Sequence, residues 1–257
     1  MSPQEKYIAY QTIVIKEVKR FSRIWVQTIL PPAITTTLYF VIFGNLIGPR
    51  IGEMDGFRYM DFIVPGLIMM SVITNSYSNV VSSFYSSKFQ RNIEEMLVSP
   101  VPNYIILLGY VSGGVARGLA VGFVVTLVAL FFSDLTIHSL GVLVSVVLLT
   151  AVLFSLGGFI NGVFARSFDD VSIVPTFVLT PLTYLGGVFY SINMLPDIWR
   201  VVSMANPILY MVNTFRYGFL GISDIGLGIA YTIVLAFTGG LFVFALQLLN
   251  RGVGIRA

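Results

Sequence analysis

The chain has 257 residues, of which 56% are hydrophobic and only 11% charged, and its mean hydropathy is +0.87. Soluble domains carry about a quarter charged residues, so this composition excludes an ordinary soluble protein and indicates a membrane protein. The net charge of +3 is not clustered, and there is no cysteine and only one histidine, which argues against nucleic-acid binding, a disulfide framework and a metal site.

Residues 5–22 have the pattern of an amphipathic helix. Ile8, Ile15 and Phe21 recur at helical spacing opposite Lys16 and Lys19. Such a helix lies in the headgroup region of a membrane. We expect it to anchor the chain beside the first membrane span, and docking of a partner is the alternative.

Six apolar stretches are long enough to cross a bilayer, which takes about 20 residues per helix. They are 24–47, 60–83, 111–132, 140–164, 173–190 and 227–249. The fifth is the shortest and contains Pro175 and Pro181, which interrupt helices. The sequence therefore predicts an all-α integral membrane protein with six transmembrane helices in one domain, residues 1–257.

The distribution of lysine and arginine predicts the orientation. Six spans place both termini on one side, and ten of the 15 Lys and Arg residues lie on that side, Arg256 among them, against four on the other. Cytoplasmic loops carry the excess of positive charge. We therefore expect both termini and residues 88–103 to be cytoplasmic.

Two of the predicted spans carry polar side chains along one face. In the second they follow i, i+4, i+7 spacing, and in the fifth they share one face with Gly187. They are Ser71, Asn75, Ser78, Asn79 and Ser82, and Thr176, Thr180 and Thr183. Such faces contact other helices or line a polar cavity rather than lipid. Local bonding of Ser and Thr to their own backbone is the alternative.

The third span contains overlapping G-x-x-x-G pairs around Arg117, including Gly109, Gly113 and Gly118. This spacing allows close helix packing, either within one subunit or between two. We expect Arg117 to have a structural role, reaching toward the membrane surface or pairing with Asp169 or Asp170.

Residues 88–98 form a short amphipathic helical pattern between the second and third spans. Phe89, Ile93 and Met96 fall on the apolar face, and Pro100 and Pro102 stop the helix. Glu94 and Glu95 would repel anionic lipid headgroups. A protein partner in the cytoplasm is therefore favoured over a simple solvated connector.

Before the last span, residues 194–221 are too polar to cross the membrane and contain two helix-start signals, Pro196-Asp197 and Asn206-Pro207. With Trp199, Arg200 and Arg216, this segment is expected to form short helices at the outer interface or dipping into it.

Four segments in this order resemble one family. They are FQRNIEEMLVSPVP at 89–102, GGVARG at 113–118, FDDVSIVPTFVLTPLTYLGGVFYS at 168–191 and NPILYMVNTFRYGFLG at 206–221. Together they resemble the ABC-2 type membrane subunits of ATP-binding-cassette transporters, most closely the YadH-type permeases of the bacterial inner membrane. The resemblance covers nearly the whole chain.

The resemblance implies an exporter subunit that forms a homodimer and works with two copies of a separate ATP-binding subunit. In that family a short cytoplasmic helix fits into a cleft on the ATPase. The corresponding residues here are Phe89, Gln90, Arg91, Asn92, Ile93, Glu94, Glu95 and Met96. It also implies a transport route between the two subunits, for which the polar faces of the second and fifth spans are the candidates. Relatives move lipids, glycolipids, polysaccharides or drugs, so the substrate is expected to be amphipathic.

The chain itself is expected to bind no cofactor. It contains no G-x-x-x-x-G-K-[ST] motif to hold nucleotide phosphates, so ATP and Mg²⁺ would bind to the partner. An ion-coupled secondary transporter is the main alternative, although Arg117 is its only ionisable candidate within a span. A membrane enzyme is disfavoured because the acidic residues lie in loops or at span ends.

Overall fold

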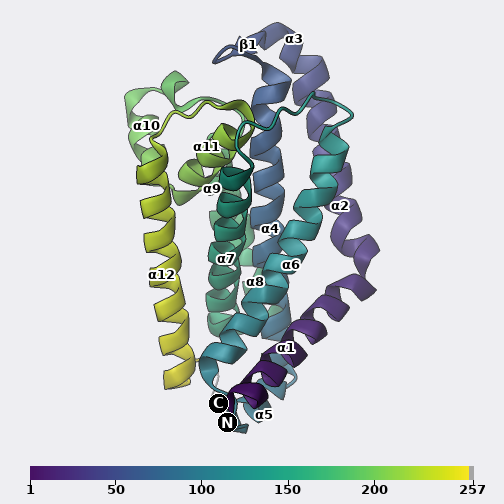
Figure 1. Ribbon diagram of the computed structural model, residues 1–257, viewed down its shortest axis with the longest axis vertical. Helices are drawn as coiled ribbons and strands as arrows, with labels where there is room; N and C mark the ends of the chain where they lie inside the picture. Colours follow the sequence, from purple (N-terminus) through teal and green to yellow (C-terminus); the bar gives the residue numbers. More distant parts are fainter. Residues whose placement is uncertain (255–257) are drawn as a thin grey trace.

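Long helices packed side by side form the body of the protein in the computed structural model, which describes residues 1–254 (Figure 1). Within those residues, five helical stretches are long and apolar enough to cross a membrane. They are Trp25–Ile51, Tyr59–Phe89 (α4), Asn103–Ala129 (α6), Leu140–Phe164 (α7) and Leu227–Arg251 (α12). The prediction of an all-α membrane protein is confirmed. Arg256, counted above for the orientation, lies outside the described residues.

The first of these stretches changes its hydrogen-bonding pattern along its length. It consists of α2 (Trp25–Tyr39), a π-helical stretch (Phe40–Ile47) and α3 (Gly48–Ile51). An Asp55-Gly56 turn then joins β1 (Glu53–Met54) to β2 (Phe57–Arg58). Both turn residues have positive φ, as a tight hairpin of this kind requires.

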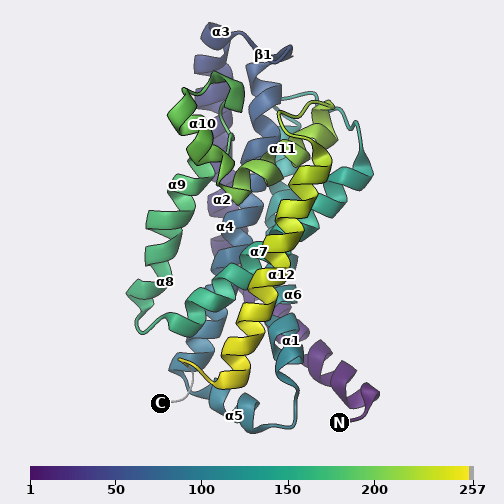
Figure 2. The same ribbon diagram turned by 90° about the vertical axis from the view of Figure 1, so that its left-hand side faces the viewer.

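The predicted fifth span is helical but broken, so the count of six is not confirmed. It comprises α8 (Phe168–Val174), a π-helical stretch (Pro175–Leu179) and α9 (Thr180–Tyr184). Pro175 and Pro181 lack the amide hydrogen that an α-helix needs, and the backbone between them adopts π-type bonding. The segment runs along one flank of the bundle (Figure 2).

Helix α4 lies at the centre of the bundle. It packs against α6, α7 and α11 (Pro207–Leu220). Of its most apolar stretch, 78% is buried, compared with 17% for the Trp25–Ile51 stretch and for α12. Most of α4 is therefore enclosed by other helices, whereas few residues of the two outer stretches are buried.

The short elements gather at the two ends of the bundle (Figures 1 and 2). Helix α1 (Pro3–Arg23), helix α5 (Asn92–Val98) and the last turn of α12 lie at one end, called here the α5 end. Helix α3, the hairpin and α10 (Asp197–Met204) lie at the other, the α10 end. The start of α1 and the last turn of α12 thus lie at the same end of the bundle, as predicted; the cytoplasmic location of this end stays a prediction.

The segment predicted to hold short outer helices contains a 3₁₀ turn (Ile192–Met194), α10 and α11. Pro207 opens α11 after the Asn206 cap, whose side chain accepts a hydrogen bond from the Ile208 amide. Helix α10 exposes large apolar side chains, whereas α11 is mostly buried against α4 and α7. The segment therefore dips into the bundle through α11.

Candidate functional site

The helix within the connector between α4 and α6 is shorter than its sequence pattern predicts. Lys88 and Phe89 complete α4, and α5 begins only at Asn92. Between them Arg91 adopts a left-handed conformation with φ of 60°. This conformation cannot continue an α-helix, so the predicted helix 88–98 is divided into the last residues of α4, a turn and α5.

Helix α5 is anchored by its apolar face. Ile93 is only 1% exposed and belongs to a hydrophobic cluster with Phe84 and Tyr110. Glu94 and Glu95 are exposed, as are Arg91 and Asn92 on the same connector, while Met96 is half-buried. Helix α5 therefore presents a charged surface outward at the α5 end.

Phe89 does not join the buried face, contrary to prediction. Its side chain is 64% exposed and lies in an aromatic group with Tyr85 and Phe168, with a ring-centre distance of 5.3 Å to Phe168. The left-handed turn at Arg91 separates Phe89 from the face of α5 that carries Ile93. An exposed aromatic group thus lies beside the charged surface of α5.

Lys88 fixes the end of α4 to the end of α7. Its Nζ donates hydrogen bonds to the carbonyl oxygens of Val163 and Ala165 at 2.7 and 2.8 Å. These carbonyls lie at the carboxyl end of α7, where backbone acceptors are unpaired and the helix dipole favours a cation. The start of the connector is therefore firmly held.

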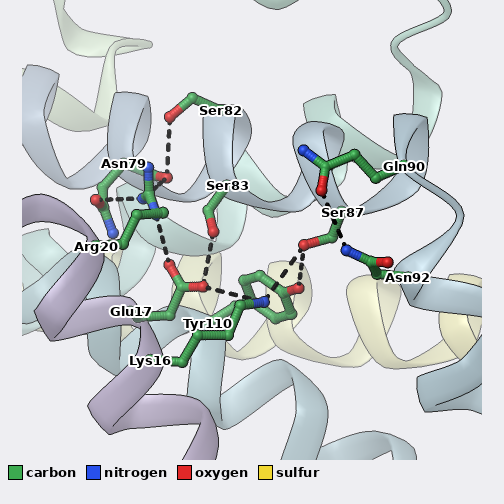
Figure 3. Close-up of polar contacts among 10 residues, drawn as sticks. All are labelled: Lys16, Glu17, Arg20, Asn79, Ser82, Ser83, Ser87, Gln90, Asn92 and Tyr110. Carbon is green, nitrogen blue, oxygen red and sulfur yellow. Dashed lines mark hydrogen bonds and ion pairs between the residues drawn. The ribbon is translucent and has the colours of Figure 1, made fainter.

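Helix α1 docks on the bundle through buried polar contacts (Figure 3). Glu17 is fully buried, accepts a hydrogen bond from Ser83 at 2.7 Å and pairs with Arg20 at 3.4 Å. Arg20 in turn donates to the backbone carbonyl and the side-chain oxygen of Asn79 at 2.9 and 2.7 Å. The predicted interfacial helix is thus also a packed part of the protein.

The same polar layer approaches the connector. Tyr110 donates to Ser87 at 2.9 Å, and Asn92 donates to Gln90 at 3.2 Å, so polar residues follow α4 from Asn79 to the turn before α5 (Figure 3). This layer connects α1 and α4 to the surface predicted to meet the ATPase.

Three residues of the predicted polar stripe line a cavity of about 330 Å³ between α2, α4 and α6. They are Ser71, Asn75 and Ser78. Hydroxyl groups of α2 complete the lining, including that of Thr36, which lies 3.4 Å from the Ser71 hydroxyl. The stripe therefore faces a polar space over part of its length.

The other predicted path residues lie elsewhere. The side-chain oxygen of Asn79 accepts a hydrogen bond from Arg20, and the Ser82 hydroxyl donates one to the backbone carbonyl of Ser78. Thr180 and Thr183 donate to carbonyls of their own helical segment, at Pro175 and Leu179. Thr176 is exposed on the same segment. The structure thus does not bring the threonines of the fifth segment into the cavity lined by α4.

Arg117 lies in this cavity, and its predicted pairing is wrong. Its guanidinium donates to the side-chain oxygen of Asn75 at 3.2 Å. Over residues 1–254 it forms no ion pair with Asp169 or Asp170. Those aspartates lie in the first turn of α8, where Asp170 accepts from the amides of Arg166 and Ser167.

Sequence reasoning missed the most deeply buried cation of the outer segment. Arg216 is 1% exposed, donates to the carbonyls of Phe62 and Gly187, and lies 3.7 Å from the centre of the Phe62 ring. Its position on the face of α11 that also carries Val212 and Phe219 was the available signal. Arg216 ties α11 to α4.

Comparison with known proteins agrees with this architecture. Residues 8–220 match the family model described as ABC-2 type transporter. The chain belongs to this family. It is 59% identical over 251 residues to the protein named inner membrane transport permease YadH of Escherichia coli strain K12, covering 98% of each chain. It is also 24% identical over 217 residues to nodulation protein J of Sinorhizobium fredii, covering 84% of this chain and 82% of that protein.

Family membership and the helices that can span a membrane make the chain a multi-pass inner-membrane protein and a transport permease. Membership of this family implies a transport subunit without its own ATPase site, and it implies an ABC-type ATP-binding partner. The exposed connector and the polar cavity are the two features of this chain on which a mechanism can be built.

Proposed function

We propose that this chain is the membrane subunit of an ATP-driven exporter, which works as a homodimer with two copies of a separate ABC-type ATPase. Residues 1–257 form one ABC-2 domain in this proposal, and both termini face the cytoplasm. The chain binds no cofactor, and the ATPase subunits bind ATP and Mg²⁺. The substrate is amphipathic.

The surface of α5 is the observation that carries the proposal. Its apolar anchor, Ile93, fixes it to the hydrophobic cluster of the bundle, while Glu94 and Glu95 point away from the protein. A short helix held in this way can transmit a displacement from a bound protein to α4 and α6. Closure of two ATPase subunits on ATP would cause that displacement.

The exposed residues give the contact its chemistry. Glu94 and Glu95 offer carboxylates, Arg91 a guanidinium, and Phe89 an exposed ring. An ATPase cleft with basic groups and an apolar pocket would complement this surface. Gln90, Asn92 and Met96 complete the predicted contact.

Replacing both glutamates by lysine tests this role. The double substitution Glu94→Lys and Glu95→Lys should abolish co-purification of the ATPase and its stimulation, since it reverses the charge of an exposed surface without changing the core. Glu53→Lys is the matched control, because Glu53 is also exposed but lies at the α10 end. Undiminished ATPase binding and stimulation by the double variant would contradict the proposal.

A further inference from the structure

The cavity between α2, α4 and α6 has an unusual combination of groups. Its polar lining consists of hydroxyl and amide side chains together with one guanidinium, and no aspartate or glutamate lines it. The polar residues that matter most here are Thr35, Thr36, Ser71, Asn75, Ser78 and Arg117. Because the one charged group in the lining, the Arg117 guanidinium, is positive, the cavity favours an anion.

Within residues 1–254, the charge of Arg117 has no counter-ion. Its only hydrogen-bond partner is the neutral Asn75, its Nε is buried without a partner, and no carboxylate lies within ion-pair distance in residues 1–254. Glu17, which packs against Gly113 of the same helix α6, is already engaged by Arg20 and Ser83. Arg20 binds Asn79, one helical turn from Asn75, but its charge is paired with Glu17, so Arg117 is the cation that the cavity presents.

The position of Arg117 within a helix that can span the membrane makes the missing counter-ion significant. Helix α6 has 27 residues, and Arg117 lies about 20 Å along it from its start. A charged side chain inside a membrane span is costly unless it pairs with an opposite charge or faces a polar cavity. The neutral groups around Arg117 satisfy only part of its hydrogen-bonding capacity.

We propose that this cavity binds the anionic head group of an amphipathic ligand, with Arg117 donating to its phosphate or carboxylate oxygens. The cavity volume of about 330 Å³ is at the lower end of ligand pockets, enough for a head group. Exposed Thr35 and Thr74 belong to its lining, so the cavity opens on the surface between α2 and α4. Acyl chains can remain outside in the lipid.

The head group can come from a resident phospholipid or from the transported molecule. The identification of this ligand as the transported molecule rests on the proposed export function. The binding of an anionic head group in the cavity does not depend on that function. The binding test therefore uses the purified permease alone, in neutral detergent, and compares phosphatidylglycerol with phosphatidylcholine of the same acyl chains by native mass spectrometry. Its result is independent of any ATPase.

Wild-type protein should prefer phosphatidylglycerol about tenfold, the size expected for one charged hydrogen-bonding contact. Asn75→Asp is the decisive variant, because it places a carboxylate on the atom that already contacts Arg117 and changes the side-chain shape very little. This variant should fold and lose the preference, as should Arg117→Gln. Arg200→Gln, at an exposed position of α10, should keep it. A wild-type preference retained in Asn75→Asp would overturn the proposal.

A second arm separates the two sources in the reconstituted complex with its ATPase. If anionic amphiphiles raise ATP hydrolysis and Asn75→Asp removes that rise, the head group belongs to the substrate. If binding depends on Arg117 while ATP hydrolysis is indifferent to the lipid, the head group belongs to a resident phospholipid. Both outcomes support an anion site, and a failure to assemble with any ATPase would affect only the export proposal.

Discussion

Arg216 shows how one buried side chain can hold two elements together. Its guanidinium donates to the carbonyl of Gly187 at 2.6 Å, in the turn after α9, and to that of Phe62 in α4. Gly187 has a φ of 72°, which a residue with a side chain rarely adopts, so the turn that presents this carbonyl depends on glycine. The position of the outer segment thus depends on Arg216.

Arg216→Met should therefore destabilise the protein although it keeps an apolar stem of similar length. The carbonyl of Gly187 would lose a charged donor inside the protein, a loss of about 1–3 kcal/mol in the free energy of unfolding. Thermal unfolding in detergent measures it, with Arg200→Met, at an exposed position, as the control. Equal melting temperatures for the two variants would contradict this role.

The residue scale also shows where sequence reasoning reached its limit. The polar stripe of α4 follows from helical spacing alone, and Ser71, Asn75 and Ser78 do face a polar cavity. The partner of Arg117 could not be deduced, because its contact with Asn75 depends on how α4 and α6 are packed. Hydropathy and spacing describe one helix at a time, whereas pairing depends on two.

Among the elements, α1 gains its position from two glycines of α6. A β-carbon on Gly113 would lie 2.5 Å from Cβ of Glu17, and one on Gly109 would lie 2.5 Å from Cγ2 of Ile13. Gly118 similarly lies against Ser76 of α4. Of the two alternatives for the glycine spacing, packing within the subunit is therefore the one that the structure confirms for these positions.

Gly113→Ala should loosen α1 from the bundle. Overpacking of a tight contact costs about 1–3 kcal/mol, which would expose the basic residues of α1 to trypsin roughly tenfold more often. The rate of cleavage after Lys16 or Arg20 in the intact protein measures this opening. Gly239→Ala in α12 is the control, since a β-carbon there meets nothing within 4 Å. Equal cleavage rates in both variants would show that α1 does not depend on this contact.

Sequence patterns located most elements because long apolar runs and capping residues act locally. Asn206 caps α11 through its side chain, at the helix start that the Asn206-Pro207 pair predicts. The turn between α4 and α5 was hidden, since nothing in the residue types around Arg91 requires a left-handed conformation. The break in the fifth segment was visible only as two prolines, and the π-helical bonding between them depends on the surrounding helices.

For the whole molecule, the broken segment from α8 to α9 raises the question of what covers it. Irregular backbone at membrane depth occurs where it is buried in protein or lines a water-filled cavity, because lipid cannot bond its free polar groups. Here the segment lies on the flank of the bundle with Thr176 and Thr180 exposed (Figure 2). A second copy of the chain is the cover that the proposed homodimer would provide.

The absence of cysteine makes this arrangement directly testable, because a single introduced thiol is then the only one in the chain. Phe177, in the π-helical stretch, is 73% exposed, and Phe123 of α6 is 65% exposed in the same chain. Phe177→Cys should form a disulfide-linked dimer in native membranes under mild oxidation, since a segment beside a two-fold axis lies close to its own copy. Phe123→Cys should remain monomeric on a non-reducing gel. Cross-linking at residue 123 but not at residue 177 would place the dimer interface on α6, and the segment from α8 to α9 would then need another cover.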